Sequence, residues 1–176
     1  MARKPKPTVE RYGGGYRINL QFEERDLIAR LMGEMRSLLL GSTDDDRVRR
    51  LFPTAYHQEG DRAMDDEYQR LMREDLVTSR LKGLDLVEGC LGTVGAASAQ
   101  LSDAQMLAFV QALNGVRLVL GTVLDVDEDH DLDDITDDHP LVGEYHLYAF
   151  LSWVLDWCMQ ALQAQAGQGR SGQALA

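Results

Sequence analysis

The chain has 176 residues, of which 44% are hydrophobic and 27% charged, as is typical of one soluble globular domain. Its net charge is −11, but nine of its 29 acidic residues lie between Asp125 and Asp138, so the rest is nearly neutral. This negative charge argues against direct DNA contact. Charged residues interrupt the longest apolar stretches, so no membrane span is expected. Two cysteines without a signal peptide indicate a cytoplasmic protein.

The N-terminal part of the chain differs in character from the rest. Residues 1–7 are basic and contain two prolines, which predicts a disordered leader. Residues 8–22 place apolar side chains at strand spacing around the glycines at 13–15, which predicts a short β-hairpin or a single strand. Such a small element must pack on other elements to be stable.

Helical spacing of apolar residues predicts helices over 23–40, 44–52, 65–73, 75–93, 103–124 and 140–165. The fold class is therefore mainly α, a bundle of about five helices with the N-terminal β element, in a single domain over 8–166. Residues 95–100 are expected to be a flexible connector, and residues 167–176 a disordered tail. The apolar stripe expected on the first helix consists of Leu27, Leu31, Met35 and Leu38.

The helix over 103–124 carries two strong signals. Ser102 and Gln105 form a capping-box pattern at its start. Gly115 and Gly121 lie inside it, and each costs roughly 1 kcal/mol of helix propensity relative to alanine. Close approach of another helix would offset that cost, so this helix is expected to be central.

The acidic loop after this helix has aspartates at alternate positions, which resembles a calcium-binding loop. His130 stands where that loop needs glycine, and Thr136 stands where it needs a closing glutamate, so no specific metal site is predicted. The residues that could hold a loosely bound cation are Asp125, Asp127, Asp129, Asp131 and Asp133. Two alternatives stay open: a solvated acidic loop that binds nothing, or a surface that binds a basic protein partner, centred on Asp127, Asp129 and Asp131.

Arg117 lies on an apolar helix, one turn after Asn114. A buried arginine needs a counter-charge or several carbonyl groups. Two interpretations stay open: an internal ion pair with Glu74, Asp75 or Asp85, or a small-anion site formed with Asn114.

A second cluster of arginines lies between residues 47 and 73, interleaved with acidic residues. It predicts either a solvated face of mixed charge or a partner-binding patch that includes Arg50. Phe52, beside Leu51 and Pro53, is either an exposed docking residue or a plug for the core.

No catalytic set can be assembled from this sequence, so it is not expected to be an enzyme and needs no cofactor. His139 and His146 have no third ligand at suitable spacing. Trp153 and Trp157 are one turn apart and suit either core packing or a subunit interface, such as that of a homodimer.

Four pieces of the sequence together resemble one known family. They are residues 50–56 (RLFPTAY), Asp75-Leu76 with Arg80, residues 113–121 (LNGVRLVLG), and the last helix with Tyr148, Leu151 and Trp153. Over residues 8–165 the chain is similar to the actinomycete oxidative-stress regulator family (AosR-like).

The resemblance implies a non-enzymatic cytoplasmic regulator of the thiol-oxidative stress response. Such a protein acts with a sigma factor or RNA polymerase to raise expression of cysteine-biosynthesis genes, and a redox sensor would have to be Cys90, Cys158 or both. Genes of this family neighbour that of a ClpS-type adaptor, so the resemblance also implies an alternative role in Clp-protease-linked protein turnover. From the residues alone, a protein that binds a small anion or a divalent cation stays open.

Overall fold

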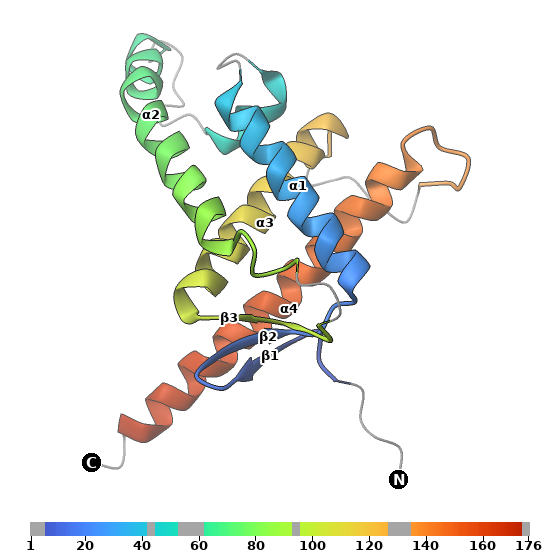
Figure 1. Ribbon diagram of the computed structural model, residues 1–176. Coiled ribbons are helices and arrows are strands. Elements are labelled where there is room, and N and C mark those ends of the chain that lie inside the picture. The colour runs from blue at the N-terminus through green and yellow to red at the C-terminus, as the bar shows by residue number, and fades with distance from the viewer. Residues whose placement is uncertain (1–5, 42–44, 53–61, 93–95, 127–134, 174–176) are drawn as a thin grey trace.

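The computed structural model describes residues 6–41, 45–52, 62–92, 96–126 and 135–173. Within these residues the chain forms four α-helices, one 3-10 helix and a small antiparallel sheet at one end of the bundle (Figure 1). The elements in chain order are β1 (Val9–Tyr12), β2 (Gly15–Ile18), α1 (Phe22–Leu40), η1 (Asp46–Leu51), α2 (Arg62–Val87), β3 (Ala99–Leu101), α3 (Asp103–Val123) and α4 (Val142–Gln173). The predicted mainly α fold class is confirmed.

The predicted N-terminal hairpin is present. β1 and β2 pair from Val9 opposite Ile18 to Tyr12 opposite Gly15. Gly13 and Gly14 form the turn at φ +58° and +82°, a conformation that the tightest hairpin turns require and glycine adopts without strain. β3 then pairs with β2, although the sequence predicted a flexible connector there. Three residues of strand give little local signal, and this strand is fixed by a partner about eighty residues earlier.

α1 buries a different face from the one predicted. Its buried residues are Arg25, Ile28, Met32, Met35 and Leu39. Of the predicted stripe, Met35 alone is buried, while Leu27, Leu31 and Leu38 are half-buried. Both sets have helical spacing, so the pattern of apolar residues alone could not choose between them.

α2 is one continuous helix, so the predicted break between Arg73 and Asp75 was wrong. Glu74 is a good helix former and gives the helix no reason to end there. In Figure 1, α2 runs obliquely down the left of the view with its N-terminal end at the top, and α1 lies to its right. Met64 and Leu71, near the N-terminal end of α2, are more than half exposed.

α3 is the central helix, packed against α1, α2, η1 and α4. Its capping box is formed as predicted: the Ser102 amide donates to Gln105 Oε1 at 2.9 Å, and the Gln105 amide donates to Ser102 Oγ at 3.3 Å. A Cβ atom at Gly115 would lie 2.6 Å from Met35 Cε of α1, and one at Gly121 would lie 3.1 Å from Tyr148 Cε2 of α4. The close approach expected at both glycines is confirmed.

Within the described residues, α3 is also the one helix long and apolar enough to cross a membrane. This is weak evidence for a span, since the core helix of a soluble protein meets the same test. Here 44% of the apolar window is buried against other elements of the fold.

α4 ends later than predicted. It continues to Gln173, beyond the expected end near Gln165 and into the segment expected to be a tail. Glutamine and alanine, which favour helices, dominate the sequence before Gly167. Residues 1–5 of the expected leader and residues 174–176 of the expected tail lie outside the described residues.

Candidate functional site

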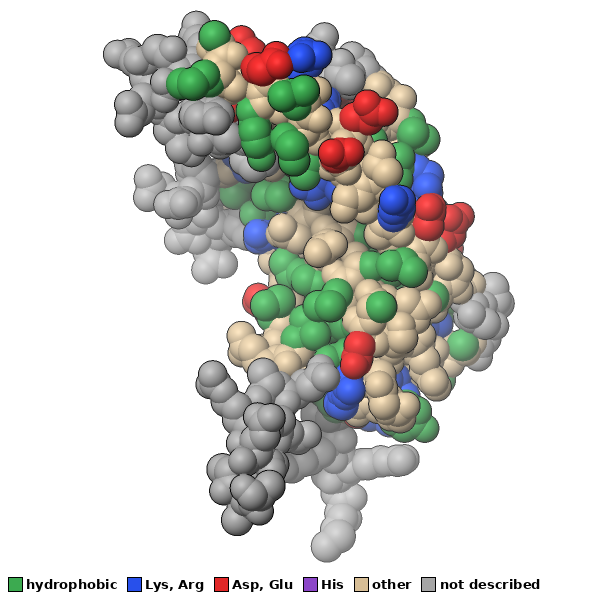
Figure 2. Space-filling view, turned by 90° about the vertical axis from the view of Figure 1, so that its left-hand side faces the viewer, with side chains coloured by type: hydrophobic (Ala, Val, Ile, Leu, Met, Phe, Trp, Pro, Cys, Tyr) green, Lys and Arg blue, Asp and Glu red, His purple; other side chains and the backbone are tan. Residues whose placement is uncertain are grey.

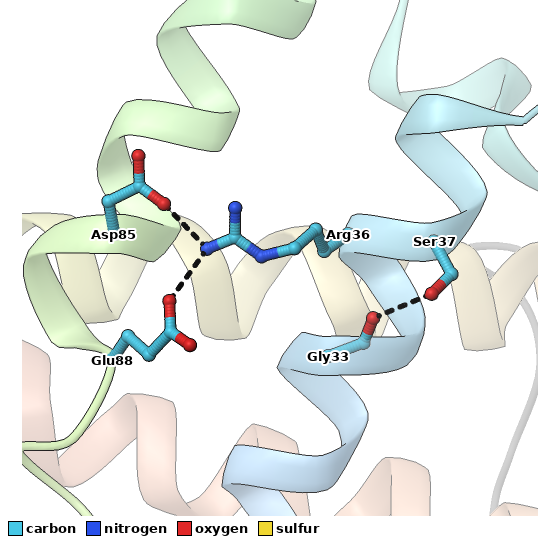
Figure 3. Close-up of polar contacts among 5 residues, drawn as sticks. All are labelled: Gly33, Arg36, Ser37, Asp85 and Glu88. Carbon is cyan, nitrogen blue, oxygen red and sulfur yellow. Dashed lines mark hydrogen bonds and ion pairs between the residues drawn. The ribbon is translucent and has the colours of Figure 1, made fainter.

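A polar clamp joins α1 to the C-terminal part of α2. Nη2 of Arg36 donates to Asp85 Oδ1 at 2.7 Å and to Glu88 Oε2 at 3.2 Å (Figure 3). Asp85 lies in the last turn of α2 and Glu88 directly follows the helix, and Arg36 reaches both from α1. The clamp holds the C-terminal end of α2 against α1, and the groove described next lies farther along α2, towards its N-terminus.

A groove of about 560 Å³ lies between the end of α1, η1 and the N-terminal half of α2. Its floor is apolar, formed by Leu38, Leu39, Val48, Phe52 and Val77. Its rim is polar and charged, with side chains from Asp66, Gln69, Arg70, Arg73, Glu74 and Thr78. Figure 2, which views the side of the molecule on which α2 lies in Figure 1, shows hydrophobic side chains exposed among charged ones. Protein–protein interfaces commonly have an apolar centre and a polar rim, and this groove has the same composition.

Phe52 is the buried aromatic residue in the floor of this groove. It is 7% exposed, so it plugs the core and is not a protruding docking residue. The guanidinium carbon of Arg73 lies 4.2 Å from the centroid of its ring, within the range of a cation–π interaction. Nε of Arg73 is buried and has no hydrogen-bond partner, and no described carboxylate pairs with this arginine. Arg70 differs, since it forms an ion pair with Glu67 at 2.7 Å.

Arg50 belongs to a different surface from Phe52. A Cβ atom at Gly121 would lie 3.2 Å from Nη1 of Arg50, which places this guanidinium against α3 beside Tyr148. Its neighbour Arg49 approaches Asp125 at 3.7 Å. The two candidate partner-binding residues of this region, Arg50 and Phe52, therefore contact different parts of the fold.

Asp125, the first residue of the candidate cation loop, terminates α3. It has φ +53°, with its amide bonded to the Thr122 carbonyl and the Val126 amide bonded to the Gly121 carbonyl. This is a Schellman motif, the usual end of a helix. The other candidates, Asp127, Asp129, Asp131 and Asp133, lie outside the described residues. Among described residues, no group of three potential ligands could hold a metal ion.

Arg117 and Asn114 point to different neighbours. Arg117 faces α4, where its Nη1 is 3.5 Å from Ser152 Oγ and its guanidinium carbon is 5.5 Å from the centroid of the Tyr148 ring. No described carboxylate forms the predicted ion pair with Arg117: Asp85 pairs with Arg36, while Glu74 and Asp75 are exposed on α2. Asn114 instead lines a second cavity, towards α2.

Residues 5–162 match the family described as "Domain of unknown function (DUF2017)". The chain belongs to this family. Searches of curated proteins and of solved structures found no match. Three of the segments that carry the resemblance given above meet in this DUF2017 fold, since Arg80 of α2 bonds to Leu51 of η1 and Gly115 of α3 lies close to Leu51.

The two cysteines of this DUF2017 chain have different environments. Cys158 on α4 is fully buried, and burial raises the pKa of its thiol to about 12. Cys90, just after α2, is half-buried, and its sulfur accepts a hydrogen bond from Gln105 Nε2 at 3.0 Å. A redox sensor needs an exposed thiol of lowered pKa, so the surroundings of Cys158 are unfavourable for that role.

Sequence reasoning placed Arg73 in a charged cluster but did not assign the groove. Asp66, Gln69 or Arg70, Arg73 and Val77 share one face of α2, at spacings of three and four residues. This mixed stripe was a signal that could have been found, but it was hidden by the predicted break in the helix. The contribution of α1 and η1 to the groove depends on tertiary packing.

Proposed function

We propose that this DUF2017 protein is a non-enzymatic regulatory module that binds an amphipathic helix of a protein partner in the groove between α1, η1 and α2. The observation that carries the proposal is the open apolar floor, held in place by Phe52, beneath a charged rim. The groove runs along α2 from Asp66 to Thr78. At 1.5 Å per helical residue this is about 18 Å, the length of a three-turn helix. Helix-in-groove recognition uses this arrangement.

The rim indicates the chemistry of the partner helix. Arg73 is held over Phe52, yet its buried Nε has no acceptor and no described carboxylate pairs with it. A carboxylate on the partner helix, next to its apolar face, would supply the counter-charge that the Arg73 guanidinium lacks. Charge-assisted hydrogen bonds to arginine are stronger than neutral ones, so this contact would add both affinity and register.

The identity of the partner rests on the resemblance to oxidative-stress regulators. We propose that the partner is a sigma factor or another part of RNA polymerase, that binding takes place in the cytoplasm, and that it serves the thiol-oxidative stress response. The alternative, a role in Clp-protease-linked turnover, would use the same groove. The two roles are distinguished by which protein is bound.

The proposal is tested by co-purification from the native cell with two matched charge reversals on α2. Arg73→Glu reverses the cation at the groove, while Lys82→Glu makes the same change at an exposed position outside it. We expect RNA polymerase or a sigma factor to be retained by the wild type and by Lys82→Glu. Retention by Arg73→Glu should fall roughly tenfold or more, as for loss of a charge-assisted contact.

Each part of the proposal has its own contrary result. Retention of Clp components in place of transcription proteins would contradict the proposed partner. Equal retention by the two variants would contradict the groove. Circular dichroism of Arg73→Glu is the control for folding, and a Thr78→Trp variant, which blocks the groove from an exposed position, repeats the test without removing the contact between Arg73 and Phe52.

A further inference from the structure

A second cavity, of about 300 Å³, lies between α1, α2 and α3, next to the groove. Its apolar wall includes Met35 of α1 and Leu76 of α2. Its polar side chains are Ser79 and Arg80 of α2 with Gln111 and Asn114 of α3. The cavity therefore has apolar and polar sides that face a common space.

Arg80 is the charged side chain that lines this cavity. Its Nη2 donates to the carbonyl oxygen of Leu51 at 2.8 Å, but its Nε is buried without a hydrogen-bond partner. No described carboxylate forms an ion pair with it. Burial lowers the pKa of this guanidinium below its ordinary value, which is the cost of a charge removed from water without a counter-charge. An anion in the cavity would remove that cost.

Neutral polar groups surround the same space. In the described part of the chain, the side chains of Ser79, Gln111 and Asn114 make no hydrogen bond to one another or to other residues. Gly83, on the cavity wall, has no atom within 4 Å of the position that its Cβ would take. The cavity thus contains one cationic side chain, neutral hydrogen-bond donors and acceptors, and unfilled space beside Gly83.

We propose that this cavity is a binding site for a small organic carboxylate with a short apolar tail. The fork of an arginine matches a carboxylate in geometry. One cation suits a single negative charge, whereas a phosphate dianion would be left half-neutralised beside the apolar wall. Met35 and Leu76 would contact the tail, while Asn114, Gln111 and Ser79 would bind the remaining polar atoms. This site stands independently of partner binding in the groove.

The test is isothermal titration calorimetry of the full chain with sodium isovalerate, and with inorganic phosphate at the same ionic strength. We expect saturable binding of isovalerate and none of phosphate. Arg80→Gln should weaken isovalerate binding at least tenfold. Gly83→Leu, which fills the cavity and keeps Arg80, should weaken it as much. Arg36→Gln, at an arginine that already has two carboxylate partners, should bind as the wild type does.

Two results would overturn the proposed location of the site. One is absence of saturable binding by isovalerate to the wild-type chain. The other is binding that Gly83→Leu leaves unchanged, since the ligand would then lie elsewhere. Phosphate binding in preference to isovalerate would overturn the assignment to a carboxylate. Because Gly83→Leu retains the hydrogen bond from Arg80 to Leu51, unfolding caused by loss of that bond cannot imitate the expected result.

Discussion

Nη2 of Arg80 donates a hydrogen bond to the carbonyl oxygen of Leu51, 2.8 Å away, and so attaches the end of η1 to the C-terminal part of α2. The next residue along the chain is Phe52, on which Arg73 stacks. The bond therefore positions the floor of the groove, and it also places Arg80 in the wall of the neighbouring cavity. One arginine links the two sites that the structure offers.

Replacing Arg80 should therefore reduce stability. We expect Arg80→Met to lower the free energy of unfolding by about 1–2 kcal/mol, because a part-buried carbonyl loses a charged donor. Urea denaturation followed by circular dichroism measures the change. Lys82→Met, at an exposed position two residues away, should change stability by less than about 0.5 kcal/mol. Similar losses of unfolding free energy at the two positions would contradict a stabilising role for the hydrogen bond from Arg80 to Leu51.

Arg25 is the buried arginine of α1, and its side chain is 1% exposed. It donates to the carbonyl oxygens of Leu20 at 3.0 Å, Leu91 at 3.1 Å and Ala96 at 2.7 Å, and so joins the β2–α1 and α2–β3 connections to the start of α1. Arg25→Met would leave three carbonyls without this donor, and we expect a loss of at least about 3 kcal/mol of unfolding free energy. Urea denaturation is again the measurement. A loss below about 1 kcal/mol, comparable to that of the exposed Arg30→Met, would contradict this role.

Cys158 should be chemically inert in the folded protein. Its buried thiol has a pKa of about 12, so almost no thiolate is present at pH 8, and a reagent must wait for local unfolding. We expect an aromatic disulfide reagent to modify Cys90 first and Cys158 only in urea. Mass spectrometry of the labelled peptides distinguishes the two. Rapid labelling of Cys158 would contradict its burial, and a Cys90–Cys158 disulfide after mild peroxide treatment would show a redox role that these surroundings do not favour.

The carboxylate of Asp45, before the start of η1, should become protonated only at unusually low pH. Hydrogen bonds from Arg47, first from its side chain and then from its amide, lower the pKa of Asp45 to about 2. Because the folded-state pKa lies below the unfolded value of about 4, the contribution of Asp45 is present above pH 4 and lost as the pH falls towards 2. A carboxyl-detected NMR titration measures it. We expect Arg47→Gln to return the pKa towards its ordinary value, and an unchanged pKa in that variant would contradict the assignment.

The sequence allowed prediction of the elements that have strong local signals. The glycine turn, the capping box at Ser102 and the close packing at Gly115 and Gly121 were all confirmed. The turn and the cap depend on backbone conformations that a few adjacent residues determine. The glycines indicated close packing because their cost in helix propensity needs a compensating contact. The short strand β3 was missed because it is defined by its pairing with β2 and not by its own residues.

The burial and the contacts of the charged residues were harder to predict from the sequence. The sequence drew attention to Arg117 on an apolar helix, but Arg25 is the arginine that is fully buried, and three carbonyl groups from two connecting segments surround it. The floor and rim of the groove come from α1, η1 and α2, so no single stretch of sequence contains it. Sequence reasoning found Phe52 and Arg73 in one charged region, but their stacked arrangement depends on the packing of η1 against α2.

The most direct test of partner binding is photo-crosslinking in the native cell from two neighbouring positions of α2. Benzoylphenylalanine at Thr78 lies at the groove, while the same group at Asp75 is exposed but outside it. We predict that a sigma factor or RNA polymerase subunit becomes cross-linked from position 78 and not from position 75. Cross-linking of that partner from position 75 alone, or from neither position, would contradict the groove as the docking site.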